Sequence, residues 1–297
     1  MKASALNPMK GVILCADDFA VNESASTGIA KLASSGRISA TSVMVLSPRW
    51  PQDVALLHDL RGQIDVGLHL DWTSAFAAAS GHGLSLPAAM LKATLGSFGS
   101  DAAFTVTRGV IERQLDAFEA HWKAPPDYVD GHQHVQQFAG IREALVQVLV
   151  SRYGGGGAQA TGNAHRPYLR ISRAAAGTFD AKSLVIAAMG AVALEKLATE
   201  AGLVVTNSLL GVYDFSGTPA RYAVLMDGWL SAAPVGCVIM CHPAQAAEPG
   251  DAIGVARAQE FAYLGSADFA AALAAARIQL VRGASSLFGL IGTQSVR

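Results

Sequence analysis

GVILCADDF, residues 11–19, joins an uninterrupted apolar run to two adjacent carboxylates. An apolar run of this length, without polar alternation, is typical of a strand buried on both faces of a parallel sheet. The next stretch, Asn22–Ser35, has the length and spacing of a helix, and Gly36 closes it. The segment therefore predicts a strand over Gly11–Ala16, followed by the two acids and a helix.

The same alternation of short β-rich runs and longer helical stretches continues along the chain. Further strands are predicted over Ser39–Leu46, Ile64–Leu70, Tyr128–Asp130, Pro167–Ile171, Leu203–Thr206, Gly236–Cys241 and Ile278–Val281. Further helices are predicted over Pro51–Leu60, Asp101–Trp122, Gly140–Tyr153, Ala181–Ala201, Thr218–Ser231 and Ala256–Ala275. Such alternation indicates parallel βα units, so we expect an α/β fold with about seven parallel strands.

Length and composition favour a single enzyme-sized domain over residues 1–297. The chain has 51% hydrophobic and only 15% charged residues, which excludes a disordered or nucleic-acid-coating chain. Its formal net charge of -1 provides no field that would attract nucleic acid or an anionic membrane surface. The mean hydropathy of +0.32 raises the question of a membrane-spanning segment. Even so, the longest apolar stretch, Leu184–Leu194, is far shorter than the roughly 20 residues of a membrane span, so no span is expected.

The cysteines and the N-terminal residues favour a cytoplasmic location. Three cysteines, Cys15, Cys237 and Cys241, make an odd number without paired spacing, and each lies in or beside an apolar run. A disulfide framework is therefore not expected, whereas burial in a reducing compartment is. The residues before Gly11 contain no apolar segment of the kind that a secretory signal needs.

Acids, histidines and one arginine fall at or just after the ends of the predicted strands. The carboxyl ends of parallel strands meet at one rim, where α/β folds place their active sites. We therefore expect these side chains to lie together: Asp17, Asp18, His69, Asp130, His132, His134, Arg170 and His242.

The pair Asp17-Asp18 has two interpretations. Adjacent carboxylates repel each other unless a cation or a shared proton relieves the repulsion, so one of them could bind a metal while the other acts as a base. Alternatively, the pair caps the helix that follows and forms a hydrogen bond within its loop.

The histidines at the strand ends suggest metal ligands. His132 and His134 are two residues apart, so in an extended segment both would face the rim, and imidazole is a common ligand of Zn²⁺. The alternative is a partly buried histidine with a backbone partner. His69 would complete an Asp-His-His set with open coordination positions, although a lone histidine at a strand end is more often a core residue. His242, before Pro243, could protonate a leaving amine or simply lie in a turn.

Four motifs follow one another along the chain: ILCADDF at residues 13–19, GLHL at 67–70, DGHQH at 130–134 and CHP at 241–243. Together they resemble the YdjC-like family of carbohydrate deacetylases. That family includes chitooligosaccharide deacetylases and hopanoid-biosynthesis-associated deacetylases. The resemblance runs from the first predicted strand to about Leu264, and the motifs are specific as an ordered set rather than singly.

The resemblance implies a distorted (β/α) barrel, similar to a TIM barrel, that carries one divalent cation, Mg²⁺ or Zn²⁺. Matched to the motifs of this chain, Asp18, His69 and His132 are implied as the metal ligands and Asp17 as the general base. His242 is similar in position to the catalytic acid of the family.

Three further residues, Arg170, His134 and Gln136, are expected to line the substrate site. Arg170 would match a rim arginine able to hold the Asp17 carboxylate ionised. Members of the family often have a third histidine where this chain has Gln136. We therefore expect Gln136 either to lie outside the metal's ligand shell or to contact the substrate.

The expected function is the metal-dependent removal of an N-acetyl group from an acetylated amino sugar or oligosaccharide, with release of acetate. One alternative is a metal-dependent phosphoester hydrolase, for which the motifs offer few basic residues to clamp a phosphate. Another is a metal- or glycan-binding protein without catalysis. An acetylated sugar is the expected partner, and the apolar composition leaves room for a homodimer face. Ala75–Ser97 and Gly154–Gly157 are expected to be loop-rich stretches that shape the cleft.

Overall fold

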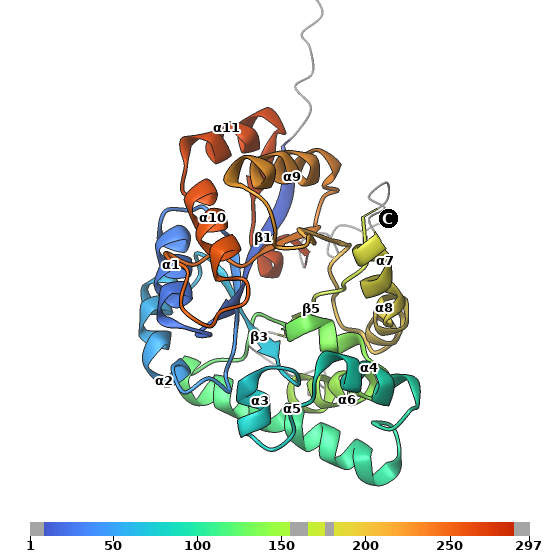
Figure 1. Cartoon of the computed structure of the whole chain (residues 1–297). Coiled ribbons are helices and arrows are strands. Elements are labelled where there is room, and N and C mark those ends of the chain that lie inside the picture. Colours follow the sequence, from blue (N-terminus) through green and yellow to red (C-terminus); the bar gives the residue numbers. More distant parts are fainter. Residues whose placement is uncertain (1–8, 155–165, 176–180, 288–297) are drawn as a thin grey trace, which may run out of the picture.

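The computed structural model describes residues 9–154, 166–175 and 181–287 (Figure 1). All pairings between its strands are parallel. Within the described ranges the strands are β1 (Lys10–Phe19), β2 (Ala40–Val43), β3 (Asp65–Leu70), β4 (Tyr128–Gly131), β5 (Tyr168–Leu169), β6 (Leu209–Leu210), β7 (Val238–Cys241) and β8 (Ile278–Leu280).

The sheet curls into a distorted barrel, which confirms the predicted α/β barrel fold. Its path runs β5-β4-β3-β2-β1-β7-β6, and β8 pairs with the first residues of β1 beside this path. The regions of the two end strands approach each other through isolated bridges, Leu169 to Val205 and Ala174 to Leu209. The strand predicted over Leu203–Thr206 is thus reduced to a bridge at Val205, and the sheet instead continues through β6, a few residues later.

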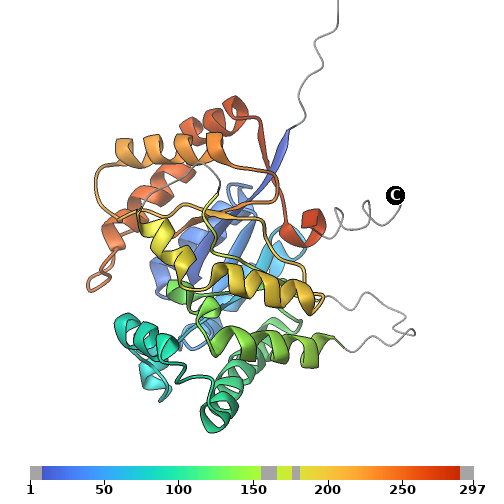
Figure 2. The same cartoon turned by 90° about the vertical axis from the view of Figure 1, so that its right-hand side faces the viewer.

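Helices surround the barrel (Figures 1 and 2). They are α1 (Glu23–Ser34), α2 (Trp50–Asp53), η1 (Val54–Leu60), α3 (Ala75–Ala79), α4 (Leu86–Thr94), α5 (Asp101–Trp122), η2 (His132–Gln137), α6 (Ile141–Tyr153), α7 (Ala181–Ala188), α8 (Ala191–Glu200), α9 (Pro219–Ala232), α10 (Gly254–Leu264) and α11 (Ala267–Ala275), where η marks a 3₁₀ helix.

Three predicted helices are each divided in two. The prediction over Pro51–Leu60 becomes α2 and the 3₁₀ helix η1. The prediction over Ala181–Ala201 becomes α7 and α8, because Gly190 adopts a φ of 125° that a helix cannot contain. The prediction over Ala256–Ala275 becomes α10 and α11, because Ser266 is extended and its hydroxyl accepts a hydrogen bond from the Phe269 N–H, as an N-cap does.

The prediction of a loop-rich Ala75–Ser97 was wrong, because this stretch contains α3 and α4. Both helices begin after a serine whose hydroxyl accepts backbone N–H groups of the first turn, Ser74 for α3 and Ser85 for α4. In the other stretch expected to be loop-rich, Gly154–Gly157, Gly154 follows α6, and residues 155–157 lie outside the described residues.

β1 is the central strand of the barrel. It pairs with β2 along one edge and with β7 along the other, and every residue from Val12 to Phe19 is buried. This burial on both faces explains why the sequence shows an apolar run instead of alternation. The three cysteines are buried and free, as predicted. Among the described residues, no helix combines the length and the apolarity that a membrane crossing requires.

The interior of the barrel is filled partly by stacked tyrosines. The rings of Tyr128 and Tyr168 have centroids 5.1 Å apart at an interplanar angle of 19°. Gly67 on β3 faces this pair, and a Cβ atom added there would lie 2.5 Å from Cζ of Tyr128. Since both tyrosines are almost completely buried, a shift of either ring would disturb the packing of its neighbours.

We predict that Gly67→Ala lowers the free energy of unfolding by about 1–3 kcal/mol through this overpacking. Urea denaturation of the variant and the wild type measures the difference. Gly228→Ala on α9 is the matched control, because an added Cβ meets nothing within 4 Å there. That control should be neutral or stabilise by up to about 1 kcal/mol. Equal stability of Gly67→Ala and the wild type would contradict the packing argument.

Candidate metal centre and active site

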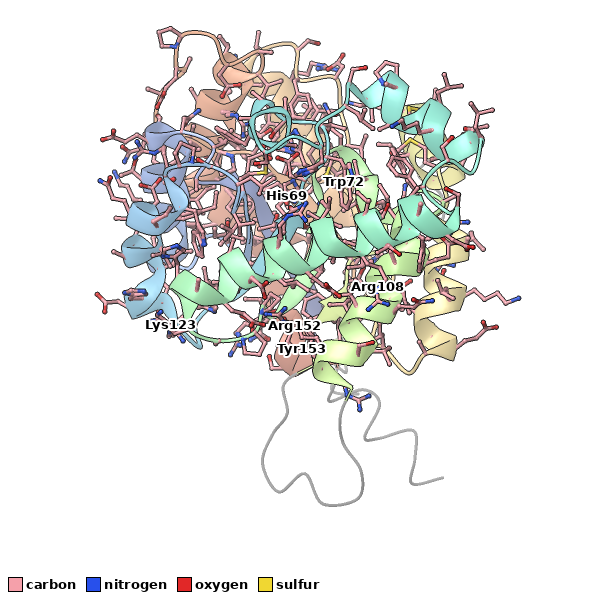
Figure 3. All side chains as sticks on the ribbon, turned by 90° about the horizontal axis from the view of Figure 1, so that it is seen from below. His69, Trp72, Arg108, Lys123, Arg152 and Tyr153 are labelled. Atoms are coloured by element: carbon pink, nitrogen blue, oxygen red, sulfur yellow. The ribbon has the colours of Figure 1, made fainter. Side chains whose placement is uncertain are left out.

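Seven of the nine site residues expected from the sequence line one cavity of about 520 Å³ at the carboxyl ends of the strands, and Asp130 and Gln136 do not belong to its lining. The seven are Asp17, Asp18, His69, His132, His134, Arg170 and His242. Figure 3 shows His69 near the middle of the molecule, among side chains of several elements. One wall of the cavity is apolar and comes from α4, from α7 and from the residue that follows α7, through Leu86, Met90, Val185, Ile186 and Met189.

Asp17 and Asp18 both line this cavity although they are neighbours in β1. In a regular strand, adjacent side chains point to opposite faces. Here Asp18 adopts a left-handed φ of 66°, and the register between β1 and β2 shifts between Ala16 and Phe19. Such a bulge changes the direction of a side chain, so it lets two consecutive carboxylates face the same space.

Asp18, His69 and His132 form a group that could hold a metal ion. Oδ1 of Asp18 lies 3.4 Å from Nε2 of His69 and 3.1 Å from Nδ1 of His132. One ligand atom from each residue lies within 4.8 Å of the other two. Two imidazole nitrogens and one carboxylate oxygen, converging from three elements, fit a divalent cation with open coordination positions.

The segment that carries His132 and His134 is not extended, so the geometry predicted for it was wrong. It forms the 3₁₀ helix η2, in which Gln133 and His134 have left-handed φ values of 52° and 62°. Nδ1 of His134 lies 3.0 Å from Oγ of Ser172, and His134 is not part of the metal-capable group. Burial, together with the charge of Arg170, lowers the pKa of His134 to about 3, so this imidazole is neutral.

Asp130 orients His69, a role that the sequence analysis did not assign. Oδ1 of Asp130 lies 2.6 Å from Nδ1 of His69, which leaves Nε2 turned toward Asp18. Burial lowers the pKa of His69, but the surrounding carboxylates, Asp130 first, outweigh it and raise the pKa to about 10. A carboxylate behind a histidine in this way fixes the tautomer of a metal ligand. The parallel register that sets His69 opposite Asp130 could not be derived from the sequence.

Asp17 is held by Arg170 in a two-pronged ion pair. Nη1 and Nη2 of Arg170 lie 2.6 and 2.8 Å from the two carboxylate oxygens of Asp17, and the Ser42 hydroxyl donates to Oδ1 at 3.1 Å. Burial alone would raise the pKa of Asp17, but Arg170 outweighs it and keeps the pKa well below the usual range. Nη1 of Arg170 also lies 2.8 Å from Oδ2 of Asp130. The Arg170 guanidinium is therefore paired with two carboxylates. Contact of Arg170 with substrate stays a prediction.

His242 follows β7 on the other side of Asp17. Its Nε2 lies 3.9 Å from Oδ2 of Asp17, and its ring meets Phe215 edge to face with centroids 5.1 Å apart. Burial is the main cause that lowers the pKa of His242 to about 4. The imidazole is therefore neutral at pH 7.

Gln136 lies behind the cavity wall. It is completely buried, and its amide Nε2 donates to Oγ of Ser172 at 3.2 Å and to the carbonyl oxygen of Arg170 at 3.3 Å. Of the two expectations for this residue, these contacts favour a place outside the metal-capable group, and contact with substrate stays a prediction.

Two buried charged residues of α10, Arg257 and Glu260, were missed. Nη2 of Arg257 lies 2.6 Å from Oδ2 of Asp18, whereas Glu260 accepts a hydrogen bond from the backbone N–H of His242. Neither belongs to a strand-end motif. The one signal in the sequence is a pair of opposite charges three residues apart in a mostly apolar helix.

Comparison with known proteins places the chain in a family. The family model described as "YdjC-like protein" matches residues 11–275. Comparison with curated protein sequences finds no significant match. Two solved structures share the fold. One, from Enterococcus faecalis V583, is described as a candidate cellobiose-phosphate cleavage protein; it is 16% identical with a TM-score of 0.65, covering 93% of this chain and 98% of its own.

The other is the Xyl-CE4 domain of a multidomain xylanase from the hindgut metagenome of Trinervitermes trinervoides. It is 9% identical with a TM-score of 0.51 and covers 96% of this chain and 92% of its own. At these identities, both likenesses concern the fold alone.

Glu260 generates a prediction about the pH dependence of stability. Burial raises the pKa of Glu260 to about 7. A carboxyl whose pKa is higher in the folded than in the unfolded chain contributes stability below its unfolded pKa of about 4.3. That contribution disappears as the pH rises to about 7.

Glu260→Gln should therefore lose less stability than the wild type between pH 4.5 and pH 7. Urea denaturation at a series of pH values measures both slopes, and their difference cancels the contributions of the other groups. Parallel stability curves for the two proteins would show that Glu260 has no raised pKa in the folded state.

Proposed function

The chain belongs to the YdjC-like family, and on this basis we propose that it is a metal-dependent hydrolase that removes the N-acetyl group from an acetylated amino sugar or oligosaccharide. One observation carries the proposal. A metal-capable Asp-His-His group, an ionised carboxylate paired with an arginine, and a neutral histidine all line one cavity. Metal-assisted amide hydrolysis uses a Lewis acid, a base, and a group that takes up a proton and passes it to the leaving amine. The motifs that carry the resemblance supply all of these residues except the arginine.

The proposed metal ligands are Asp18, His69 and His132, which would hold one divalent cation. Two nitrogens and one carboxylate oxygen suit a transition metal such as Zn²⁺, while the resemblance also admits Mg²⁺. When bound, the cation would polarise the acetyl carbonyl and lower the pKa of a water molecule beside it. Asp130 would keep Nε2 of His69 directed at this position, since it bonds to the opposite nitrogen.

Asp17 is the proposed general base and His242 the proposed acid. Arg170 holds Asp17 ionised, so the carboxylate can accept a proton from the attacking water as the new C–O bond forms. When the C–N bond breaks, the amine must receive a proton, which His242 would donate. Because His242 is neutral at pH 7, that proton reaches it during turnover, and Asp17 lies 3.9 Å away. The products are acetate and the free amino sugar.

The alternative of phosphoester hydrolysis receives less support from the cavity. Phosphate recognition relies on cations such as arginine that can donate to phosphate oxygens. Three lysine or arginine side chains belong to the described lining. Both arginines are bonded to carboxylates, Arg170 to Asp17 and Arg257 to Asp18, and Lys182 donates to the carbonyl oxygen of Tyr213 at 2.6 Å. The family resemblance also favours the deacetylase. We therefore retain N-acetyl hydrolysis by one domain spanning the chain as the proposal.

One prediction of the proposed function concerns the substrate. Purified protein with added Zn²⁺ or Mg²⁺ should release acetate from at least one of N-acetylglucosamine, di-N-acetylchitobiose and an octyl glycoside of N-acetylglucosamine. The octyl glycoside is included because one cavity wall is apolar. Chelation should abolish the release and metal should restore it. Phosphate release from a generic phosphoester without any acetate release would contradict the proposal.

The second prediction separates the metal ligands from the base. His69→Ala and His132→Ala should lose both the bound metal and the activity, because each removes one of three ligands. Asp17→Asn should keep its metal but lose about 10²–10⁴-fold in rate, which is the usual contribution of a general base. Metal content by elemental analysis and acetate release by a coupled assay give the two readouts.

The exposed His58, outside the cavity, provides the control for this experiment. His58→Ala should keep both the metal and the rate. A fully metallated His132→Ala protein would overturn the ligand assignment, and a metal-free Asp17→Asn protein would overturn the separation of roles.

A further inference from the structure

α10 carries two buried charged side chains toward the site. Arg257 is 4% exposed and Glu260 is completely buried, and they lie three residues apart, which places them on one face of the helix. Charged residues are almost never buried to this extent unless they are paired. Their partners therefore indicate what the helix does.

Arg257 connects three segments that meet at the cavity. Its Nη2 lies 2.6 Å from Oδ2 of Asp18, its Nε lies 2.8 Å from Oδ2 of Asp251, and its Nη1 lies 3.4 Å from the carbonyl oxygen of His242. Asp251 also accepts a hydrogen bond from Asn22, the N-cap residue of α1, at 3.2 Å. The guanidinium is thus held on one side while it holds Asp18 on the other.

The contact with Asp18 determines which of its oxygens faces the histidines. Oδ2 is bonded to Arg257, whereas Oδ1 is the oxygen near His69 and His132. Asp18 also has a left-handed backbone, which costs energy and needs support from its surroundings. A planar guanidinium can supply that support because its donors have a rigid geometry.

Glu260 acts on the other side of the cavity. Its Oε2 accepts the backbone N–H of His242, and its Oε1 accepts the Tyr213 hydroxyl at 2.6 Å. One turn earlier on the same helix, the carbonyl oxygen of Arg257 accepts the N–H of Ala244 at 3.1 Å. Pro243, between His242 and Ala244, has no N–H to donate. The segment that carries His242 is therefore bonded to α10 along its length.

We propose that Arg257 and Glu260 are two positioning residues with different main targets. The short bond of Arg257 goes to the metal ligand Asp18, with a longer contact of 3.4 Å to the carbonyl oxygen of His242, whereas Glu260 holds the segment of the acid His242 and does not touch Asp18. The inference rests on the proposed function. Arg257 directs one oxygen of Asp18 to the cation, and Glu260 keeps the His242 backbone in place without contact to the ligands. Loss of Arg257 should therefore weaken metal binding, whereas loss of Glu260 should slow the reaction and leave metal binding intact.

The test measures metal affinity and rate on the same set of variants. Chelator-treated full-length protein is titrated calorimetrically with Zn²⁺ and with Mg²⁺, and kcat and KM for acetate release are measured separately. Arg257→Gln should weaken the affinity for the cation about 10–100-fold, the usual effect of removing a residue that orients a ligand. Arg257→Lys keeps the positive charge but lacks the planar set of N–H donors of the guanidinium, so it should recover only part of this loss. Glu260→Gln should lower kcat, with KM and metal affinity within about twofold of the wild type.

Arg49→Gln is the matched control. Arg49 forms a two-pronged pair with Asp53, at 3.0 Å for each bond, outside the cavity. This variant should lose only stability, which thermal unfolding of every variant monitors. Tighter metal binding by Arg257→Gln would show that charge repulsion outweighs positioning and would overturn the role of Arg257. Equal loss of metal affinity in Arg257→Gln and Glu260→Gln would overturn the separation of targets. A wild-type protein that binds neither cation would overturn the proposed function itself.

Discussion

Two adjacent carboxylates are buried in β1, and the rest of the site depends on how their charge is compensated. Asp17 is 2% exposed and Asp18 is 1% exposed, so water cannot stabilise either charge. Arg170 pairs with Asp17, and Arg257 pairs with Asp18. An unpaired buried charge costs several kcal/mol. The segment after β5, which carries Arg170, and the helix α10, which carries Arg257, must therefore lie close enough to β1 for these two ion pairs to form.

The two arginines make neighbouring carboxylates chemically different. Both oxygens of Asp17 are bonded to Arg170. In Asp18, Oδ2 accepts a hydrogen bond from Arg257, whereas Oδ1 faces His69 and His132. Different surroundings of this kind commonly separate the roles of paired acids in enzymes. In this chain they support a base at Asp17 and a metal ligand at Asp18, and the bulge in β1 makes the arrangement possible by directing both side chains into one cavity.

Local sequence signals predicted the secondary structure well where one signal dominated. The helix expected over Asp101–Trp122 is α5 without any change of boundary, because its apolar spacing is regular over its full length. Errors arose where a capping residue was not recognised. Ser266 separates α10 from α11, and Ser74 and Ser85 begin helices in a stretch expected to be loops. A serine hydroxyl favours a helix start only when the following residues can form the turn, and periodicity does not report this.

The sequence alone determined the alternation of strands and helices, their parallel arrangement and the polar residues at the strand ends, because these follow from periodicity and the order of the motifs. The closure into a barrel was implied only by the family resemblance. Only the tertiary structure decided which polar groups meet. Asp130 lies behind His69 because β3 and β4 pair in one particular register. Arg257 reaches Asp18 across 239 residues of chain because α10 packs against α1, the helix that follows β1. Contacts of this kind depend on the relative placement of whole elements, which no local pattern in the sequence encodes.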